Sequence, residues 1–211
     1  MKKIIMILLA VMFLGSTASA DDKGFMQSAY DAMKAGQYES AIIFYDKALD
    51  AKSDYAPAYY GRGLAYSHLG KVSKSIDDFN KAVEYDSKMD NAYFGLGLSL
   101  IMNGKYEDAI NALDKAINIK SDEIDYYYAR GNAHKYLKNY DKALVDFSKA
   151  IEMNPNFGIA YYARGAVHKL EGRGDAALKD LEKYLQLNSN NEKLEAETKR
   201  LIEEIKEGRV N

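Results

Sequence analysis

Histidine and cysteine are the first side chains to consider, because they supply most metal sites and many nucleophiles. The chain of 211 residues has no cysteine, so thiolate ligands, catalytic thiols and disulfides are excluded. Its three histidines are His68, His134 and His168, of which the last two lie 34 residues apart. Zinc takes three or four protein ligands, and no third ligand stands at a matching spacing. We therefore expect neither a metal nor a cofactor.

Two glycine pairs that flank an arginine could indicate phosphate binding. They are Gly61-Arg62-Gly63 and Gly172-Arg173-Gly174. A phosphate loop lies between a strand and a helix N-terminus and carries a lysine, and neither segment has that context. Serines and carboxylates are plentiful but show no nucleophile–base spacing. The sequence predicts that the protein is not an enzyme.

Arginine and aspartate recur at one fixed separation. Three arginines are each followed sixteen residues later by an aspartate: Arg62 by Asp78, Arg130 by Asp146, and Arg164 by Asp180. Leu96 and Ala112 occupy the corresponding positions between the first and second of these pairs. A half-buried guanidinium needs a planar acceptor, which a carboxylate provides. We predict three structural arginine–aspartate bridges, replaced once by an apolar pair.

These spacings belong to a unit of 34 residues that repeats five times without insertion or deletion. The five repeats cover residues 22–55, 56–89, 90–123, 124–157 and 158–191. In each repeat, apolar and small residues recur at helical spacing in two segments separated by a turn. Each repeat is therefore expected to form a hairpin of two helices that buries its apolar face on the next hairpin.

A small residue lies four positions after the aromatic residue that opens each repeat. These small residues are Ala29, Gly63, Gly97, Gly131 and Gly165. Glycine inside a helix costs about 1 kcal/mol relative to alanine, so the repeated glycine indicates a steric need. We expect it to face the small residues of the second helix, Ala41, Ser75, Ala109, Ala143 and Ala177, at a close crossing.

Several short motifs occur together in a fixed order and spacing. They include Tyr161-Tyr162-Ala163-Arg164-Gly165, Lys138-Asn139-Tyr140-Asp141-Lys142-Ala143, Phe147-Ser148-Lys149-Ala150-Ile151 and Asn154-Pro155. On these motifs the chain resembles the tetratricopeptide-repeat family over all five repeats. The resemblance implies an all-α fold, a right-handed superhelical α-solenoid of five 34-residue helical hairpins. An apolar stripe over residues 192–207 predicts a C-terminal capping helix.

In proteins of this family, the first helices line a concave groove that holds a peptide. We expect an exposed recognition strip at the residues after the opening aromatics, Met26, Tyr60, Phe94, Tyr128 and Tyr162. Further along the same helices, the expected groove contains Leu64, Leu98, Asn132, Lys135 and Tyr136. The alternative is that the rings pack against the neighbouring hairpin. In heat-shock cochaperones of this family, lysines and asparagines at these positions clamp a terminal carboxylate. Only Asn132 and Lys135 match that set here, and aromatic residues occupy most of the other positions. We therefore expect the groove to prefer apolar or aromatic segments.

The first twenty residues are typical of a cleaved secretory signal. Two lysines precede an apolar run over residues 4–14, and small residues follow over 15–20. A run of about 11 residues is too short for a settled helix to cross a hydrocarbon core of about 30 Å. We expect cleavage after Ala20, no transmembrane segment in the mature chain, and a periplasmic or secreted bacterial protein. An uncleaved anchor is the alternative.

The charge balance argues against some partners. The chain has 29 basic and 31 acidic residues, with a formal net charge of −2. This balance gives no electrostatic reason to expect nucleic acid. We predict a non-enzymatic scaffold of the cell envelope that docks a peptide or protein segment in the groove. The alternatives are carbohydrate binding, with tyrosines stacked on cell-wall sugars, and self-association in an envelope assembly.

Overall fold

The computed structural model describes residues 20–187 and 191–208 of the chain, which form eleven α-helices and no strand. The signal sequence expected over residues 1–20 lies outside the described residues, apart from Ala20. The chain divides into two compact units, an N-terminal unit of residues 1–120 and a C-terminal unit of residues 121–211. The boundary falls between the hairpins of repeats three and four.

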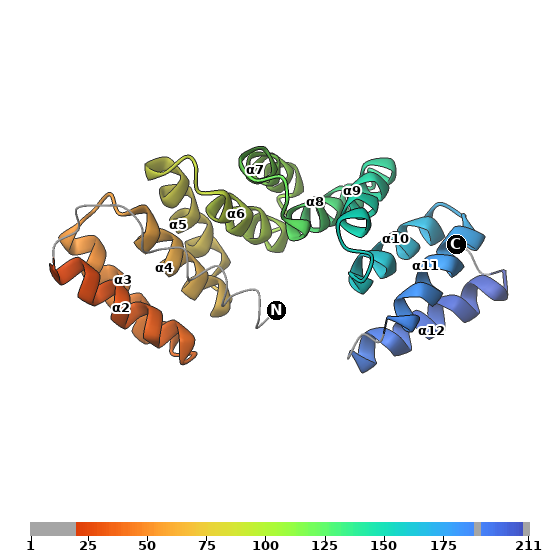
Figure 1. Ribbon diagram of the computed structural model, residues 1–211, viewed down its shortest axis with the longest axis horizontal. Coiled ribbons are helices and arrows are strands. Elements are labelled where there is room, and N and C mark those ends of the chain that lie inside the picture. Colours follow the sequence, from red (N-terminus) through yellow and green to blue (C-terminus); the bar gives the residue numbers. More distant parts are fainter. Residues whose placement is uncertain (1–19, 188–190, 209–211) are drawn as a thin grey trace. The chain divides into compact units, whose positions relative to one another are not determined.

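The N-terminal unit contains three helical hairpins (Figure 1). Its helices are α2 (Ala20–Lys34), α3 (Tyr38–Ala51), α4 (Ala56–His68), α5 (Val72–Tyr85), α6 (Asp90–Met102) and α7 (Tyr106–Ile119). The helices pair as α2 with α3, α4 with α5 and α6 with α7, while α3 also packs on α4 and α5 on α6. The first helices of neighbouring hairpins touch as well, α2 beside α4 and α4 beside α6. Each hairpin thus buries its apolar face on the next, as the repeats predict.

The C-terminal unit contains two hairpins and a closing helix (Figure 1). Its helices are α8 (Ile124–Tyr136), α9 (Tyr140–Met153), α10 (Gly158–Leu170), α11 (Gly174–Gln186) and α12 (Glu192–Lys206). Here α8 pairs with α9 and α10 with α11, while α9 packs on α10 and α12 packs on α11. The α12 helix starts at Asn191, whose side chain accepts a hydrogen bond from Leu194 N at 3.1 Å. It buries Ile202 and Ile205 and leaves most of its charges exposed, so it caps the stack.

The turn between the two helices of a hairpin needs a left-handed backbone residue. Four repeats place glycine there, with φ between 68° and 74°, and the repeat of α8 and α9 places Lys138 there with φ of 59°. A side chain in this region costs about 1–2 kcal/mol. The turn still closes, because Asn139 N donates to His134 O at 2.9 Å, just as Lys71 N donates to Tyr66 O at 2.9 Å. The packing of the two helices therefore overrides the local preference of Lys138.

The first-helix glycines meet a large side chain of the second helix. A Cβ atom on Gly97 would lie 2.6 Å from Leu113 Cγ, and one on Gly131 would lie 2.7 Å from Phe147 Cε1. The expectation that these glycines face the small residues of the second helix is therefore wrong in its main contact. The space left by the missing Cβ is occupied by the side chain of Leu113 or Phe147, which belongs to the core of the hairpin.

Replacing one of these glycines should test this close approach. We expect Gly97→Ala to lower the free energy of unfolding by about 1–3 kcal/mol, because Leu113 Cγ cannot swing away as the end of a flexible chain could. Gly24→Ala is the control, since nothing lies within 4 Å of a Cβ built there. It should gain up to about 1 kcal/mol from better helix propensity. Urea unfolding followed by circular dichroism measures both, and a Gly97→Ala protein as stable as the parent would contradict the packing.

Candidate functional site

The arginine on α4 joins three helices of the N-terminal unit. Arg62 Nε and Nη2 donate to the two carboxylate oxygens of Asp78 on α5, each at 2.7 Å. Arg62 Nη1 donates to Asp46 Oδ1 on α3 at 2.6 Å. The Asp78 side chain is 7% exposed, so the guanidinium of Arg62, rather than water, stabilises its negative charge. This arginine therefore fixes its own hairpin and ties it to the preceding one.

The C-terminal unit repeats the arrangement. Arg130 Nε and Nη2 donate to Asp146 at 2.9 and 2.7 Å, and Arg164 Nε and Nη2 donate to Asp180 at 2.7 and 2.8 Å. Arg164 Nη1 also reaches back to Ser148 Oγ on α9, at 3.0 Å. The structure thus brings together all three arginine–aspartate pairs that the sequence singles out.

The backward contacts of the arginines were missed by the sequence reasoning. Asp46 precedes Arg62 by sixteen residues, and Ser148 precedes Arg164 by sixteen residues. This mirrors the sixteen residues that separate each arginine from its later aspartate. The signal was therefore present in the same spacing, read in the opposite direction along the chain.

The tyrosines that open the repeats support these arginines. The guanidinium carbon lies 5.4 Å from the ring centroid of Tyr59 in one pair and 5.7 Å from that of Tyr127 in another. The hydroxyl of Tyr59 donates to Ser53 O, and that of Tyr127 donates to Ser121 O, both at 3.1 Å. Each ring is thereby fixed to the turn before its helix and stacks under the cation. These side chains are structural.

The residues expected to form an exposed aromatic strip are packed into the hairpins. Met26, Tyr60 and Phe94 are buried, Tyr60 at 1% exposure, and Tyr128 and Tyr162 are half-buried. The ring centroids of Tyr60 and Phe79 lie 5.9 Å apart, and those of Tyr128 and Phe147 lie 5.8 Å apart. The expectation that this strip is exposed is therefore wrong, and its three tyrosines pack against aromatic rings of the second helix of their own hairpins.

Exposed apolar side chains stand instead at the ends of the first helices. The last residues of α4, α6, α8 and α10 are all exposed, and we call them the helix-end column: His68, Met102, Tyr136 and Leu170. Met102 is 62% exposed, Tyr136 53% and Leu170 59%. Leu98, one turn before Met102, is exposed as well, whereas Leu64 packs against the core. The sequence reasoning selected Tyr136 and missed Met102 and Leu170, although the spacing of 34 residues connects all three.

The two polar groove candidates lie near Tyr136 in the C-terminal unit. Asn132 Nδ2 donates to Tyr128 O at 3.0 Å, so this amide is engaged within its own helix. Lys135 Nζ lies 5.3 Å from the ring centroid of Tyr136. Burial lowers the pKa of Lys135 below its usual range. The structure therefore brings Asn132, Lys135 and Tyr136 onto the last two turns of α8.

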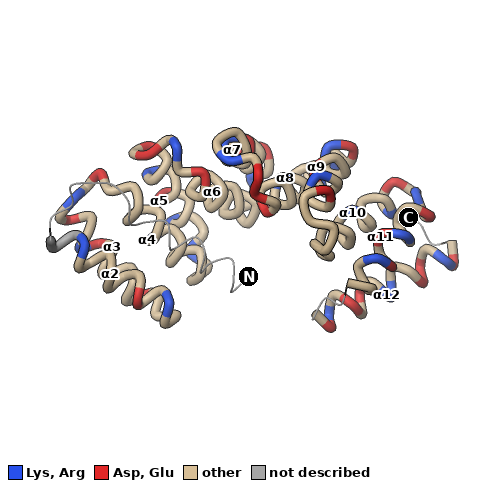
Figure 2. Tube along the Cα trace, viewed as in Figure 1, with Lys and Arg blue, Asp and Glu red and all other residues tan. Residues whose placement is uncertain are grey.

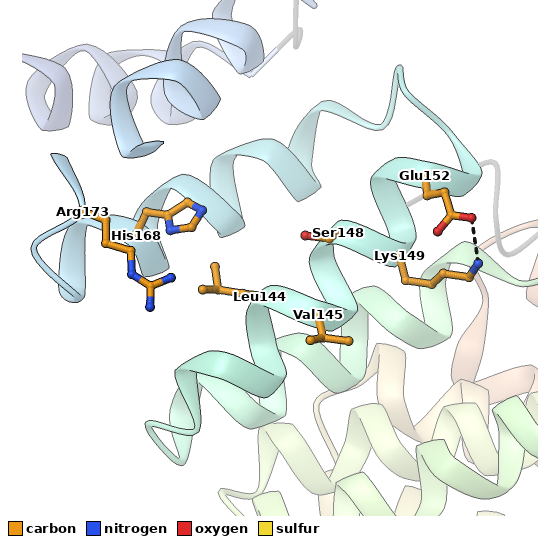
Figure 3. Close-up of a pocket in the computed structure, with 7 residues that line it drawn as sticks. All are labelled: Leu144, Val145, Ser148, Lys149, Glu152, His168 and Arg173. Carbon is orange, nitrogen blue, oxygen red and sulfur yellow. Dashed lines mark hydrogen bonds and ion pairs between the residues drawn. The ribbon is translucent and has the colours of Figure 1, made fainter. Parts of the chain in front are cut away.

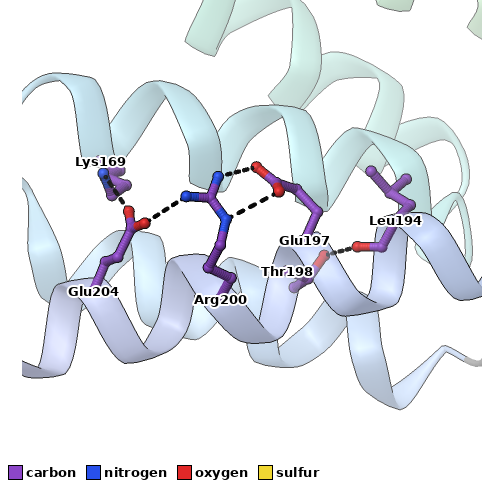
Figure 4. Close-up of polar contacts among 6 residues, drawn as sticks. All are labelled: Lys169, Leu194, Glu197, Thr198, Arg200 and Glu204. Carbon is purple, nitrogen blue, oxygen red and sulfur yellow. Dashed lines mark hydrogen bonds and ion pairs between the residues drawn. The ribbon is translucent and has the colours of Figure 1, made fainter.

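Polar contacts join the closing helix α12 to the first helix of repeat five (Figure 4). Lys169 Nζ on α10 lies 3.2 Å from Glu204 Oε2 on α12. Arg200 contacts Glu204 Oε1 at 2.6 Å and Glu197 Oε1 at 2.7 Å, which makes a continuous chain of alternating charges. The pKa of Glu197 is lowered, chiefly by its hydrogen bond from Arg200. The end of the C-terminal unit is thus closed by paired charges.

An open hollow of about 520 Å³ lies against α9 in the C-terminal unit (Figure 3). Leu144 and Val145 of α9 form an apolar part of its lining, and Arg173 stands at its other side. Ser148 Oγ, which also lines it, already accepts the hydrogen bond from Arg164, and Lys149 Nζ pairs with Glu152 Oε1 at 3.1 Å. Two of its polar groups, those of Ser148 and Lys149, are therefore already engaged by other side chains of the protein.

Two further kinds of site bear on function over residues 20–187 and 191–208, a metal site and a membrane-spanning helix. In that part of the chain, no group of three or more histidine, cysteine, aspartate or glutamate side chains could hold a metal ion. No helix among the same residues is long and apolar enough to cross a membrane. Lysine and arginine are interspersed with aspartate and glutamate along the helices of each unit (Figure 2).

Models of one repeat family match the chain four times. Models described as tetratricopeptide repeat match residues 28–55, 56–89 and 124–157, and one described as TPR repeat matches residues 99–138. Together these matches cover more than half of the chain. The chain belongs to the tetratricopeptide-repeat family. Two of the matches have the bounds that the spacing gives for repeats two and four.

Solved tetratricopeptide-repeat structures share the fold. MamA is 28% identical, with a TM-score of 0.74 over 79% of this chain and 91% of that chain. YrrB, described as a TPR protein with an unusual peptide-binding site, is 24% identical, with a TM-score of 0.72 over 87% of this chain and 100% of that chain. PilF of Pseudomonas aeruginosa is 16% identical, with a TM-score of 0.74 over 90% of each chain. No curated protein matches the chain.

The tetratricopeptide repeats of this chain offer an internal test of the arginine bridges. We expect Arg62→Leu to lower the free energy of unfolding by about 3 kcal/mol, because the buried carboxylate of Asp78 loses both of its donors. The double variant Arg62→Leu/Asp78→Ala reproduces the pair Leu96 and Ala112 of repeat three. It should recover more than half of that loss, since no unpaired charge is left buried. Urea unfolding of the parent, the single variant and the double variant measures these free energies. A double variant no more stable than the single variant would contradict the role given to the buried charge.

Proposed function

We propose that the protein is a non-enzymatic interaction scaffold of the cell envelope, which docks protein segments at the exposed ends of the first helices of each unit. Membership of the tetratricopeptide-repeat family supports an interaction scaffold. The observation that carries the proposal is the exposure of Met102 in the N-terminal unit and of Tyr136 and Leu170 in the C-terminal unit. Large apolar side chains that recur at one position of a repeat and stay exposed are typical of a contact surface.

The rigid support of this surface favours binding by a preformed shape. Arg62, Arg130 and Arg164 each fix the first helix of their repeat to the second. The scaffold then loses little conformational entropy when a partner docks, which leaves more of the contact energy as affinity. Peptide binding by YrrB, which has the same fold, agrees with this use of the repeats.

The two alternative functions have weaker support. Carbohydrate stacking needs exposed rings, and the tyrosines expected to provide them, Tyr60, Tyr128 and Tyr162, are buried or half-buried. Self-association through the C-terminal end would bury the outer side of α12, where Lys199 and Glu203 are exposed. Burial of unpaired charges is costly, so a protein segment on the first helices is the better occupant.

Crosslinking from the helix-end column tests the docking surface. We place a photoreactive residue at Met102 or Tyr136, and at Asn111, which is exposed on the second helix α7, as the matched control. The same partner protein should crosslink in the native host from Met102 and Tyr136 but not from Asn111. Adding Leu98→Ser should reduce the crosslink from Met102 about tenfold, because an apolar contact is lost. Equal crosslinking from all three sites would contradict a docking surface on the first helices.

Export is the part of the proposal that rests on residues 1–20, where an apolar run of about 11 residues is followed by small residues that end in Ala18-Ser19-Ala20. Intact-mass measurement of the protein from its host should give a chain that begins at Asp21. Ala20→Arg should cause the uncleaved precursor to accumulate, since the cleavage site requires a small residue. Ser19→Ala is the control and should be processed normally. A mature chain that retains Met1 and Lys2 would exclude cleavage.

A further inference from the structure

Lys135 and Lys169 occupy the same position in repeats four and five. The later lysine has a partner on the next helix, since Lys169 Nζ lies 3.2 Å from Glu204 Oε2 of α12 (Figure 4). The two side chains are 14% and 21% exposed, so the pair is well shielded from water. This pair shows that a lysine at this position can bind a glutamate side chain of the neighbouring helix.

Lys135 lacks such a partner. Within residues 20–187 and 191–208, its recorded contact is the ring of Tyr136, and no nearby charge opposes the effect of burial, which lowers its pKa. The residue 34 positions before Glu204 is Leu170, so an exposed apolar side chain stands where repeat five has the carboxylate. The half-buried ammonium of Lys135 thus lies beside the exposed ring of Tyr136, and the repeat spacing assigns the exposed Leu170 to the position that Glu204 has relative to Lys169.

The surroundings of Lys135 favour one carboxylate from a side chain over a chain-terminal carboxylate. A clamp for a chain terminus needs several donors that converge, and the amide of Asn132 already donates to Tyr128 O. Lys169, the nearest equivalent cation, is neutralised by Glu204. One ammonium with apolar neighbours matches one acidic side chain that is flanked by apolar residues.

We propose that Lys135 binds a glutamate side chain on a helix of the docked protein segment, and that apolar residues beside this glutamate contact Tyr136 and Leu170. The model for such a segment is α12 itself, in which Leu201 and Ile205 flank Glu204. The inference rests on the proposed docking function and names the chemistry of the partner: an amphipathic acidic helix. The charge pair would fix the position of the partner helix along α8 and would select against partners that lack the glutamate.

A displayed peptide library tests the proposal without a known partner. Random 16-residue peptides, joined to the phage through their C-termini so that no terminal carboxylate is free, are selected on the purified protein. Selections run in parallel on Lys135→Met, which keeps the aliphatic stem, on Lys135→Glu, and on Lys142→Met as control. Lys142 is exposed on α9 of the same unit. Circular dichroism first establishes that each variant has the helix content of the parent.

The parent and Lys142→Met should enrich peptides that carry glutamate beside apolar residues. Lys135→Met should lose that acidic preference, and Lys135→Glu should replace it by a preference for lysine or arginine. A selected peptide made with an amidated terminus should bind the parent as tightly as its free acid and should bind Lys135→Met about tenfold more weakly.

Three results would overturn the inference. They are the same acidic peptides selected by Lys135→Met, binding that requires a free terminal carboxylate, and selection by the parent of apolar peptides without acidic residues. The last of these would leave the docking function standing. A parent protein that enriches no peptide would contradict the docking function itself, and the inference with it.

Discussion

The arginine of the first helix is the interaction on which most of the architecture depends. Arg62 binds Asp78 of its own hairpin and Asp46 of the preceding one, while Tyr59 stacks beneath its guanidinium. A hydrophobic face alone would allow two helices to slide along each other, because apolar contact has no direction. A planar cation with five donors in fixed directions specifies both the crossing within a hairpin and the register between hairpins. The repeat can therefore be copied along the chain with a constant geometry.

This use of the arginine determines which residues are left for binding. The aromatic residue after the opening tyrosine is packed into the hairpin; Tyr60, which follows Tyr59, packs against Phe79. The next large exposed apolar side chains on the first helices come one to two turns later, at Leu98 and Met102 of α6 and at Tyr136 of α8. Stability and recognition are thus separated along each first helix. Side chains at its start hold the stack together, and side chains at its end can vary without disturbing it.

The helices of this fold could be predicted well from the sequence because the same pattern of apolar and turn residues occurs in five repeats. Two helices per repeat, the turn at Gly70 and the pairing of Arg62 with Asp78 all follow from spacing alone, since helical periodicity and a fixed separation of opposite charges can be read from the sequence. The orientation of Tyr59 relative to Tyr60 did not follow, because adjacent residues on a helix differ by about 100° and both are aromatic. Which of two neighbouring rings faces the core depends on the crossing of the helices, and the crossing is set by Arg62 and by glycines such as Gly97. The exposed strip was therefore predicted at rings that the structure buries or half-buries, whereas Leu98 and Tyr136 of the predicted groove are exposed.

Repeat three shows what happens when the polar interaction is absent. Leu96 and Ala112 replace the arginine and the aspartate, and both are buried, so an apolar contact takes the place of the ion pair between α6 and α7. The same helix α6 is buried over most of its first two turns and exposes Leu98 and Met102 further along. An apolar repeat of this kind has no charge that must be satisfied, and a partner that covers its exposed end has no ion pair to disrupt. Repeat four has the opposite design, with Arg130 satisfied by Asp146 inside the hairpin and Lys135 at its end in contact with an aromatic ring. In the proposed docking mode, the end of α6 provides an apolar contact and Lys135 provides a charge-selective one, and a partner with both apolar and acidic residues would match this combination.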